Sequence, residues 1–541
     1  MTGIASRAAD LAEVGMISPS WQTPGGPDAQ FVTCIDVRSE RLRRHLENVG
    51  PWETYGAAGF FGLPLRHVSP TGVVTERCPV LIRPANTVTE TAPSTTWGWS
   101  TSESGDALHG VESRPFTPYA LAEASGWLLG PIAAVRTAVP QWWARASTAV
   151  QSKLGAPTSG YLATTNDVDA TGVGFSIDEL VDLADGFLRS TGLVELAPVV
   201  VLCGHGGTAT NNPHLAAYDC GACGGQSGDV SARAMVQVLS DPLVAAGLLE
   251  RGLDTSGTVF VAALHDTTRD RVTFFDVAHA PTTVISRLIG DLDRATDAVA
   301  HERSVTLPQA PSTADTASLR RHLDRRAADW AQVRPEWGLA GNAAMVIGPR
   351  SLTIGSNLGG RVFLQSYRPD IDRDGALLES LMAGPLVVGQ WINMQYWCST
   401  VDPDRFGAGD KTTHNVVVGN DGVDHTLSGV LTGAHGDLRI GLPWQAVSAS
   451  APIDGRWTEL PYHDPVRLLA VICAPVAVVD AILTRQPDVA RLVLGGWITL
   501  HVVDPDSGQV FEKDAQYGWL PTRDFEVLAG EVVMLHRSTA S

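Results

Sequence analysis

Three short segments of the chain consist almost entirely of apolar residues and end at side chains that bind metals or transfer protons. They are residues 30–34 (QFVTC), 199–203 (VVVLC) and 259–264 (VFVAAL), and a histidine follows closely after the second and the third. Uninterrupted apolar runs of this length are typical of strands that are buried on both faces of a sheet. The pattern therefore predicts three buried strands with reactive side chains at their carboxyl ends.

Segments with helical spacing alternate with these strands. Residues 39–49 place apolar side chains at positions i, i+4 and i+7, and a Gly-Pro pair follows at once. Ser176 and Glu179 form a capping-box pattern at the start of residues 176–191, whose apolar positions line one helical face. Helices that alternate with buried strands indicate an α/β fold with a mainly parallel sheet, which binds ligands at the carboxyl ends of its strands.

The rest of the chain is less regular. Residues 121–150 are predicted to be helical, with breaks at Pro131 and Pro140, and residues 304–318, rich in Ser, Thr and Pro, predict a linker. We expect an N-terminal lead (1–28), a mainly parallel core (29–303) with an insertion at about 51–170, and a mixed α+β C-terminal region (319–541) that packs on the core and on a partner.

Composition and charge exclude several classes of protein. The chain has 541 residues, of which 44% are hydrophobic and 18% charged, so it is not disordered. Its net charge of −19 repels phosphate backbones, so nucleic acid is not an expected partner. The longest clean apolar run, residues 468–479, is shorter than the roughly 20 residues that span a bilayer. No transmembrane helix or apolar signal core is predicted, which favours the cytoplasm.

The first chemical signal is Cys34-x-Asp36-x-Arg38. In an extended segment these three side chains point the same way, so the sequence predicts that they converge. A thiolate is a strong zinc ligand, a carboxylate is a weaker one, and Arg38 can pair with Asp36 through two hydrogen bonds. The alternative interpretation is a buried cysteine beside a surface ion pair.

The second signal joins His205, within a Gly-rich stretch, to Cys220-x-x-Cys223. A histidine at the end of a buried strand is a plausible metal ligand, and glycines let the backbone approach closely. The cysteine pair could instead form a structural zinc clip, a redox pair or part of the core.

Together these motifs resemble the β-carbonic anhydrases, which use a C-x-D-x-R segment and a later strand that ends C-G-H. Those enzymes carry a second cysteine three residues after the histidine. Here that position is Thr208, and the next cysteine is Cys220, 15 residues after His205.

That spacing, with motifs along nearly the whole chain, resembles the DabA family of inorganic carbon accumulation subunits. The motifs are CIDVRSE (34–40), GFFG (59–62), VLCGHGG (201–207), NNP (211–213), YDCGACGG (218–225), RPEWGLAGNAA (334–344), GQWINMQYWCSTVDP (389–403), FGAGDKTTHNV (406–416) and GDLRIGLPWQ (436–445). The resemblance implies one Zn²⁺ per chain, held by Cys34, Asp36, His205 and Cys220, with Arg38 pairing to Asp36 as the catalytic dyad.

The resemblance also implies a function. It indicates a zinc-binding peripheral subunit on the cytoplasmic side of the cell inner membrane, within an energy-coupled uptake complex that hydrates CO₂ to bicarbonate vectorially. The partner implied is an antiporter-like membrane subunit, DabB. Family members commonly carry a longer segment before the first motif than the 33 residues that precede Cys34 here, so we expect its contacts to be absent or supplied by another chain.

Three alternatives stay open: a free-standing soluble β-type carbonic anhydrase, a structural zinc protein and a thiol redox protein. Among the other candidates, His265 would shuttle protons or bond to the backbone, and Cys223 would lie beside the metal without binding it. Cys203 is expected in the core, and His414 and Asn415 have no assigned role.

Overall fold

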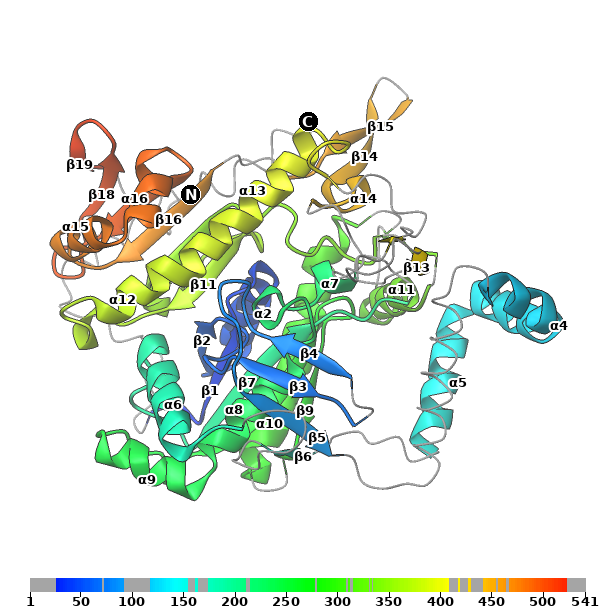
Figure 1. Cartoon of the computed structure of the whole chain (residues 1–541), viewed down its shortest axis with the longest axis horizontal. Helices are drawn as coiled ribbons and strands as arrows, with labels where there is room; N and C mark the ends of the chain where they lie inside the picture. Colours follow the sequence, from blue (N-terminus) through cyan, green and yellow to red (C-terminus); the bar gives the residue numbers. More distant parts are fainter. Residues whose placement is uncertain are drawn as a thin grey trace.

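Two sheets form the framework of the molecule (Figure 1). The computed structural model describes residues 26–70, 73–91, 117–153, 161–163, 174–210, 215–277, 280–307, 310–311, 315–329, 331–332, 334–407, 417–418, 427–429, 441–453, 456–463 and 467–522. Most of the predicted N-terminal lead, and His414 and Asn415, lie outside these residues.

The first sheet contains the three predicted strands. Its order is β2 (Glu53–Ala57), β1 (Ala29–Cys34), β7 (Val199–Gly206), β8 (Val259–Asp266) and β9 (Arg271–Phe275), and all neighbours are parallel except the β8–β9 pair. Alternate residues of its strands point to opposite faces and pack into separate clusters. Helices α2 (Val37–Val49) and α10 (Thr282–Ser304) cover one face, and α6 (Ile177–Thr191), α8 (Asp229–Leu239) and α9 (Pro242–Glu250) cover the other.

The second sheet repeats the strand order of the first. Its order is β11 (Val362–Ser366), β10 (Ala344–Gly348), β16 (Leu468–Cys473), β17 (Ile498–Val503), β18 (Val510–Asp514) and β19 (Gly518–Pro521). As in the first sheet, the earliest strand is flanked by the next strand on one side and by two later parallel strands on the other, and an antiparallel strand follows. Helices α12 (Ala376–Leu381), α13 (Val387–Val401), α15 (Val476–Arg485) and α16 (Pro487–Leu494) pack on one of its faces.

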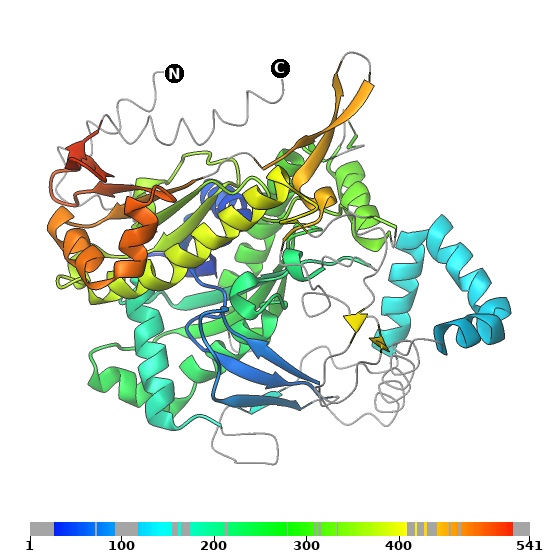
Figure 2. The same cartoon turned by 45° about the horizontal axis from the view of Figure 1, so that its top comes forward.

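The two sheets meet along their edge strands, β2 and β11 (Figure 2). Gly56 N–H donates to Ser366 Oγ at 2.9 Å, and Leu364 N–H donates to the Ile35 carbonyl at 3.3 Å. A Cβ atom on Gly56 would lie 1.8 Å from the Leu364 carbonyl oxygen, so only glycine allows this approach. The region with the first chemical signal is therefore fixed directly against the second half of the chain.

The remaining elements surround this framework. A four-stranded sheet has the order β4 (Val74–Arg77), β3 (Leu65–Val68), β5 (Thr87–Thr91) and β6 (Tyr161–Ala163), and helices α4 (Thr117–Ala138) and α5 (Pro140–Lys153) project away from the body (Figure 1). The smaller elements are α7 (Leu215–Tyr218), α11 (Thr316–Ala328), α14 (Trp444–Val447), the pair β12 (Val417–Val418) and β13 (Leu427–Gly429), the hairpin β14 (Ser448–Ile453) and β15 (Arg456–Pro461), and short 3₁₀ and π turns at Gly221–Cys223, Arg350–Leu352, Pro369–Ile371 and Met382–Leu386.

Several predicted elements differ in extent from the structure. Strands β7 and β8 continue through the two histidines, which lie within the strands rather than after them. Helix α4 continues through Pro131, which was wrongly predicted to break it, whereas Pro140 does mark a boundary because it starts α5. Among the described residues no single helix reaches the length and hydropathy of a membrane span, although α8 and α9 do so as a pair with a 68° bend.

Candidate metal centre

Two thiols and one imidazole meet at the carboxyl ends of β1 and β7. Cys34 ends β1, His205 lies near the end of β7, and Cys220 comes from the loop before the turn Gly221–Cys223. Their donor atoms all lie within 4.8 Å of one another, and the two Sγ atoms are 3.9 Å apart. All three side chains are buried, and His205 Nε2 is a buried atom without a hydrogen-bond partner. This donor set fits a metal ion such as zinc, which prefers thiolate and imidazole ligands.

Backbone geometry brings Cys220 to the two strands. Strands β1 and β7 are adjacent and parallel, which places Cys34 and His205 at one edge of the sheet. In the loop around Cys220, Cys220 N–H donates to the Gln226 carbonyl at 3.1 Å, and Gly225 N–H donates to the Cys220 carbonyl at 3.0 Å. Gly224 has a φ of +69°, and a Cβ there would lie 2.7 Å from the Glu76 carbonyl oxygen. The described residues 215–226 thus return the chain to the site.

Gly59 leaves the space that the two thiols occupy. A Cβ atom at this position would lie 2.6 Å from Cys220 Sγ and 2.9 Å from Cys34 Sγ. We expect Gly59→Ala to displace the thiols, to destabilise the fold by about 1–3 kcal/mol and to weaken metal binding. Thermal unfolding and metal analysis of the purified variant check this, with Gly126→Ala as a control because a Cβ there meets nothing within 4 Å. Equal metal content in both variants would contradict the prediction.

Asp36 and Arg38 form a buried pair beside the three donors. Asp36 caps α2 by accepting from Arg38 N–H at 3.0 Å, and the Arg38 Nε and Nη2 atoms each donate to its carboxylate at 2.8 Å. Burial alone would raise the pKa of Asp36, but the charge and hydrogen bonds of Arg38 lower it overall. Asp36 Oδ2 lies 3.5 Å from His205 Nε2, so the carboxylate is close to the donors and is held by the arginine.

The convergence of Asp36 with Arg38 arises differently from the sequence-based prediction. That prediction assumed an extended segment through Arg38, but α2 begins at Val37. Arg38 lies in the first helical turn and folds back on its own capping residue. The helix cap, rather than strand alternation, therefore brings the two charges together.

Arg38 also binds the second half of the chain. Its Nη1 donates to Glu336 Oε1 at 2.8 Å, to the Tyr218 carbonyl at 2.6 Å and to Thr267 Oγ1 at 3.2 Å. The Thr267 hydroxyl also donates to Glu336 Oε1, at 2.7 Å. Sequence reasoning missed Glu336, which is only 1% exposed. The available signal was a lone acid among apolar residues within the 334–344 motif.

The two cysteines of the site are not equivalent. A hydrogen bond with Cys220 lowers the pKa of Cys34 to about 5, and His205 adds to this effect against the opposing effect of burial. Hydrogen bonds with Cys223 and Cys34, together with burial, raise the pKa of Cys220 well above its usual value. Cys34 is therefore the more readily available thiolate of the two.

The other candidate residues lie near the site in different roles. Cys223 Sγ contacts the Gly59 carbonyl at 3.3 Å and Ser231 Oγ at 3.4 Å, and it is not part of the three-donor cluster. His265 pairs in register with His205 on the adjacent strand. Within the described part of the chain its ring nitrogens form no hydrogen bond, and Nε2 lies 3.5 Å from Asp270 Oδ1. It is therefore not bonded to the backbone through its ring. Cys203 packs in the core, as predicted.

Comparison with known proteins identifies relatives over most of the chain. The sequence model of a family described as "Probable inorganic carbon transporter subunit DabA" matches residues 7–498. Proteins with this same description are 40% identical in Salinibacter ruber, 39% in Geobacillus kaustophilus and 40% in Natronomonas pharaonis, over 93%, 89% and 92% of this chain. The matches cover 63%, 55% and 61% of those proteins, so the chain spans little more than half to under two thirds of their length. No solved structure matches.

Proposed function

The chain belongs to the DabA family, and from this we propose that it is the peripheral, metal-binding subunit of a complex that takes up inorganic carbon. The observation that supports the chemical part of this proposal is the buried cluster of Cys34, His205 and Cys220 with a paired carboxylate beside it. The description of the relatives supports the role in carbon transport, and the buried cluster is the proposed site of the chemistry.

The metal that we propose is zinc, one ion per chain. Cys34, His205 and Cys220 would hold it, with Asp36 as the ligand for the fourth position. When bound, zinc acts as a Lewis acid that lets water attack CO₂ near neutral pH, giving bicarbonate. The donors are at most 4% exposed, so the surrounding protein excludes bulk water from them.

Asp36 and Arg38 would control access to this site. In the arrangement described, Arg38 holds both oxygens of Asp36 and so keeps the carboxylate from moving closer to His205 Nε2. Without these hydrogen bonds from Arg38, Asp36 lies near enough to occupy the fourth position itself. Arg38 thereby keeps the position open, and the Asp36 carboxylate is placed to accept a hydrogen bond from water there.

The fold supports a more specific proposal about architecture. We infer that residues 29–303, with an insertion at about 51–170, form a β-carbonic-anhydrase-like core, and that residues 319–541 pack on this core and on a partner. The supporting observations are the parallel order β1-β7-β8 and the placement of Cys34 and His205 at its carboxyl edge. Strand β2, at the start of the 51–170 stretch, pairs with β1 and so belongs to the core sheet.

The thermodynamics of the reaction show that net uptake requires an energy source. CO₂ hydration is reversible, so an isolated enzyme can only bring CO₂ and bicarbonate to equilibrium. Net accumulation needs coupling to an ion gradient, and a membrane protein must supply it. We propose an antiporter-like membrane subunit, DabB, as the partner, with this chain on the cytoplasmic side of the inner membrane.

Co-expression tests the proposed partner. We expect the chain to fractionate with membranes only when a polytopic antiporter-like subunit is present, and we expect uncouplers to abolish carbon uptake while metal content is unchanged. The measurements are membrane fractionation, uptake of labelled inorganic carbon and metal analysis. A chain that stays in the soluble fraction during co-expression, and restores growth at low CO₂ alone, would favour the free-standing carbonic anhydrase.

A further inference from the structure

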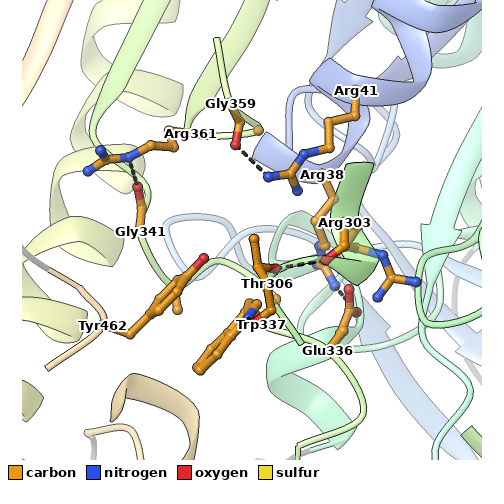
Figure 3. A pocket seen from close by; sticks show the side chains of 13 residues that line it. Arg38, Arg41, Arg303, Thr306, Glu336, Trp337, Gly341, Gly359, Arg361 and Tyr462 are labelled. Carbon is orange, nitrogen blue, oxygen red and sulfur yellow. Dashed lines mark hydrogen bonds and ion pairs between the residues drawn. The ribbon is translucent and has the colours of Figure 1, made fainter. Parts of the chain in front are cut away.

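A pocket lies between the two halves of the molecule, directly beside the Asp36–Arg38 pair (Figure 3). The pocket is shallow and opens to solvent. Four arginines and one acid are the charged residues that line it: Arg38, Arg41, Arg303, Arg361 and Glu336. Three of these arginines are paired with carboxylates, so what the pocket concentrates is guanidinium N–H donors rather than unbalanced positive charge.

The two halves contribute different walls to the pocket. Arg38 and Arg41 come from α2 and Arg303 from α10, so the first half supplies a cationic wall. The second half supplies an aromatic wall, in which the Trp337 and Tyr462 rings stack with centroids 3.8 Å apart. Figure 3 shows Arg41 reaching toward Gly359 across the pocket from these rings.

Arg41 is the arginine with hydrogen-bonding capacity to spare. Its Nε lies 3.1 Å from Glu302, and its Nη2 donates to the Gly359 carbonyl at 2.5 Å. Its Nη1 forms no hydrogen bond within the described part of the chain. In contrast, Arg303 is held by Asp270 at 2.7 Å, and Arg361 donates to the Gly341 carbonyl and points away from the pocket in Figure 3.

Arg38 links the pocket to the metal centre. The same guanidinium binds Asp36, lies 3.5 Å from His205 Nδ1 and lines the pocket. An anion that leaves the donor cluster on this side therefore meets Arg38 first and the arginine-rich wall next. Glu336 also lines the pocket and binds Arg38, so its negative charge opposes tight retention of an anion.

We propose that this pocket binds one small oxyanion, with Arg41 as the principal donor, and that in the cell the anion is the bicarbonate formed at the metal centre. Nη1 of Arg41 is the donor nitrogen left for such an anion, because Nε and Nη2 already bond to Glu302 and to the Gly359 carbonyl. The identity of the anion rests on the proposed function, whereas the oxyanion site itself rests on the geometry of the pocket alone.

A titration of the purified chain with ¹³C-labelled bicarbonate, followed by NMR line broadening, tests the proposal. Arg41→Gln removes the charge and shortens the side chain but keeps a polar end, and we expect it to weaken binding about tenfold, equivalent to 1.4 kcal/mol. Glu336→Gln removes the repulsion, and we expect it to tighten binding. Arg491→Gln serves as a control, because Arg491 is a surface residue of α16 with 79% of its side chain exposed, and it should change nothing.

Opposite shifts in the first two variants would support the pocket, because loss of structure alone would weaken binding in both. No shift in either variant would overturn the proposal. The same titration in Cys220→Ser, checked for folding by circular dichroism, separates pocket from metal. Binding that persists without metal supports the pocket, and binding that disappears with the metal contradicts it.

Two further results identify the anion and separate this inference from the proposed function. Tighter binding of phosphate or sulfate than of bicarbonate would overturn bicarbonate as the occupant. CO₂ hydration without any anion binding in the pocket would refute this inference and leave the proposed function intact. A third result would support the oxyanion site and refute the proposed function. In it, Arg41→Gln weakens anion binding and Glu336→Gln tightens it, but the chain does not hydrate CO₂ even with its partner.

Discussion

Alanine in place of Cys34, His205 or Cys220 is expected to remove most of the metal from the purified chain. The three donor atoms lie within 4.8 Å of one another, and each is one of three protein ligands in the proposed zinc site. Because a site with only two strong ligands holds zinc poorly, we expect metal content to fall from about one equivalent to roughly a tenth of that or less. Elemental analysis after gel filtration measures the change.

Cys223→Ala provides the matched control for these variants. Cys223 lies in the same C-x-x-C motif and packs beside Cys220, but its Sγ is not one of the three grouped donor atoms and also contacts Gly59 and Ser231. It should therefore keep its metal. Nearly full metal in Cys220→Ala, with loss in Cys223→Ala, would assign the third ligand to Cys223 and refute the site as described.

Asp36→Ala is expected to keep the metal and lose carbon uptake. Three of the proposed ligands remain in this variant, but the group that we propose to exchange between Arg38 and the metal is gone. We expect uptake to fall by about 100-fold or more, in the range typical of the loss of a catalytic acid or base. Labelled carbon uptake and elemental analysis of the same cultures provide the measurement.

Arg38→Ala is also expected to keep the metal and to lose carbon uptake, but for the opposite reason. Without Arg38 the Asp36 carboxylate is free to stay at the fourth position, which closes the site. Removal of this buried arginine also leaves Asp36 and Glu336 without their partner, at a cost of about 3–5 kcal/mol. Arg38→Lys, which keeps the charge but not the fork of donors, separates the two effects. Full carbon uptake in Arg38→Ala would show that the Asp36–Arg38 pair is only a structural contact.

The features that the sequence predicted best are local ones. Strands β1 and β7 are fully buried, so their residues form almost entirely apolar runs, and these runs end near Cys34 and His205. The capping box at Ser176 is confirmed for the same reason, because its two hydrogen bonds span three residues. Assignment of Cys220 as a ligand depended on family resemblance, since no local pattern distinguishes it from Cys223.

The features that the sequence did not predict depend on long-range contacts. The Arg38–Glu336 pair joins residues 298 positions apart, and only the packing of β2 against β11 brings them together. The strands of the second sheet were not predicted from the sequence either. Its strands β10 and β16 are neighbours in space, but more than one hundred residues separate them, and its repeated strand order has no counterpart in the sequence. Packing, rather than periodicity, decides such features.

The most direct test of the central claim is ¹⁸O exchange between CO₂ and water, measured with metal content on one sample of the complex purified from membranes. The proposal predicts about one zinc per chain and exchange that Cys34→Ala abolishes while the chain stays in the complex. Full zinc occupancy without any exchange, in a complex that still accumulates carbon in cells, would contradict it and make the metal a structural one.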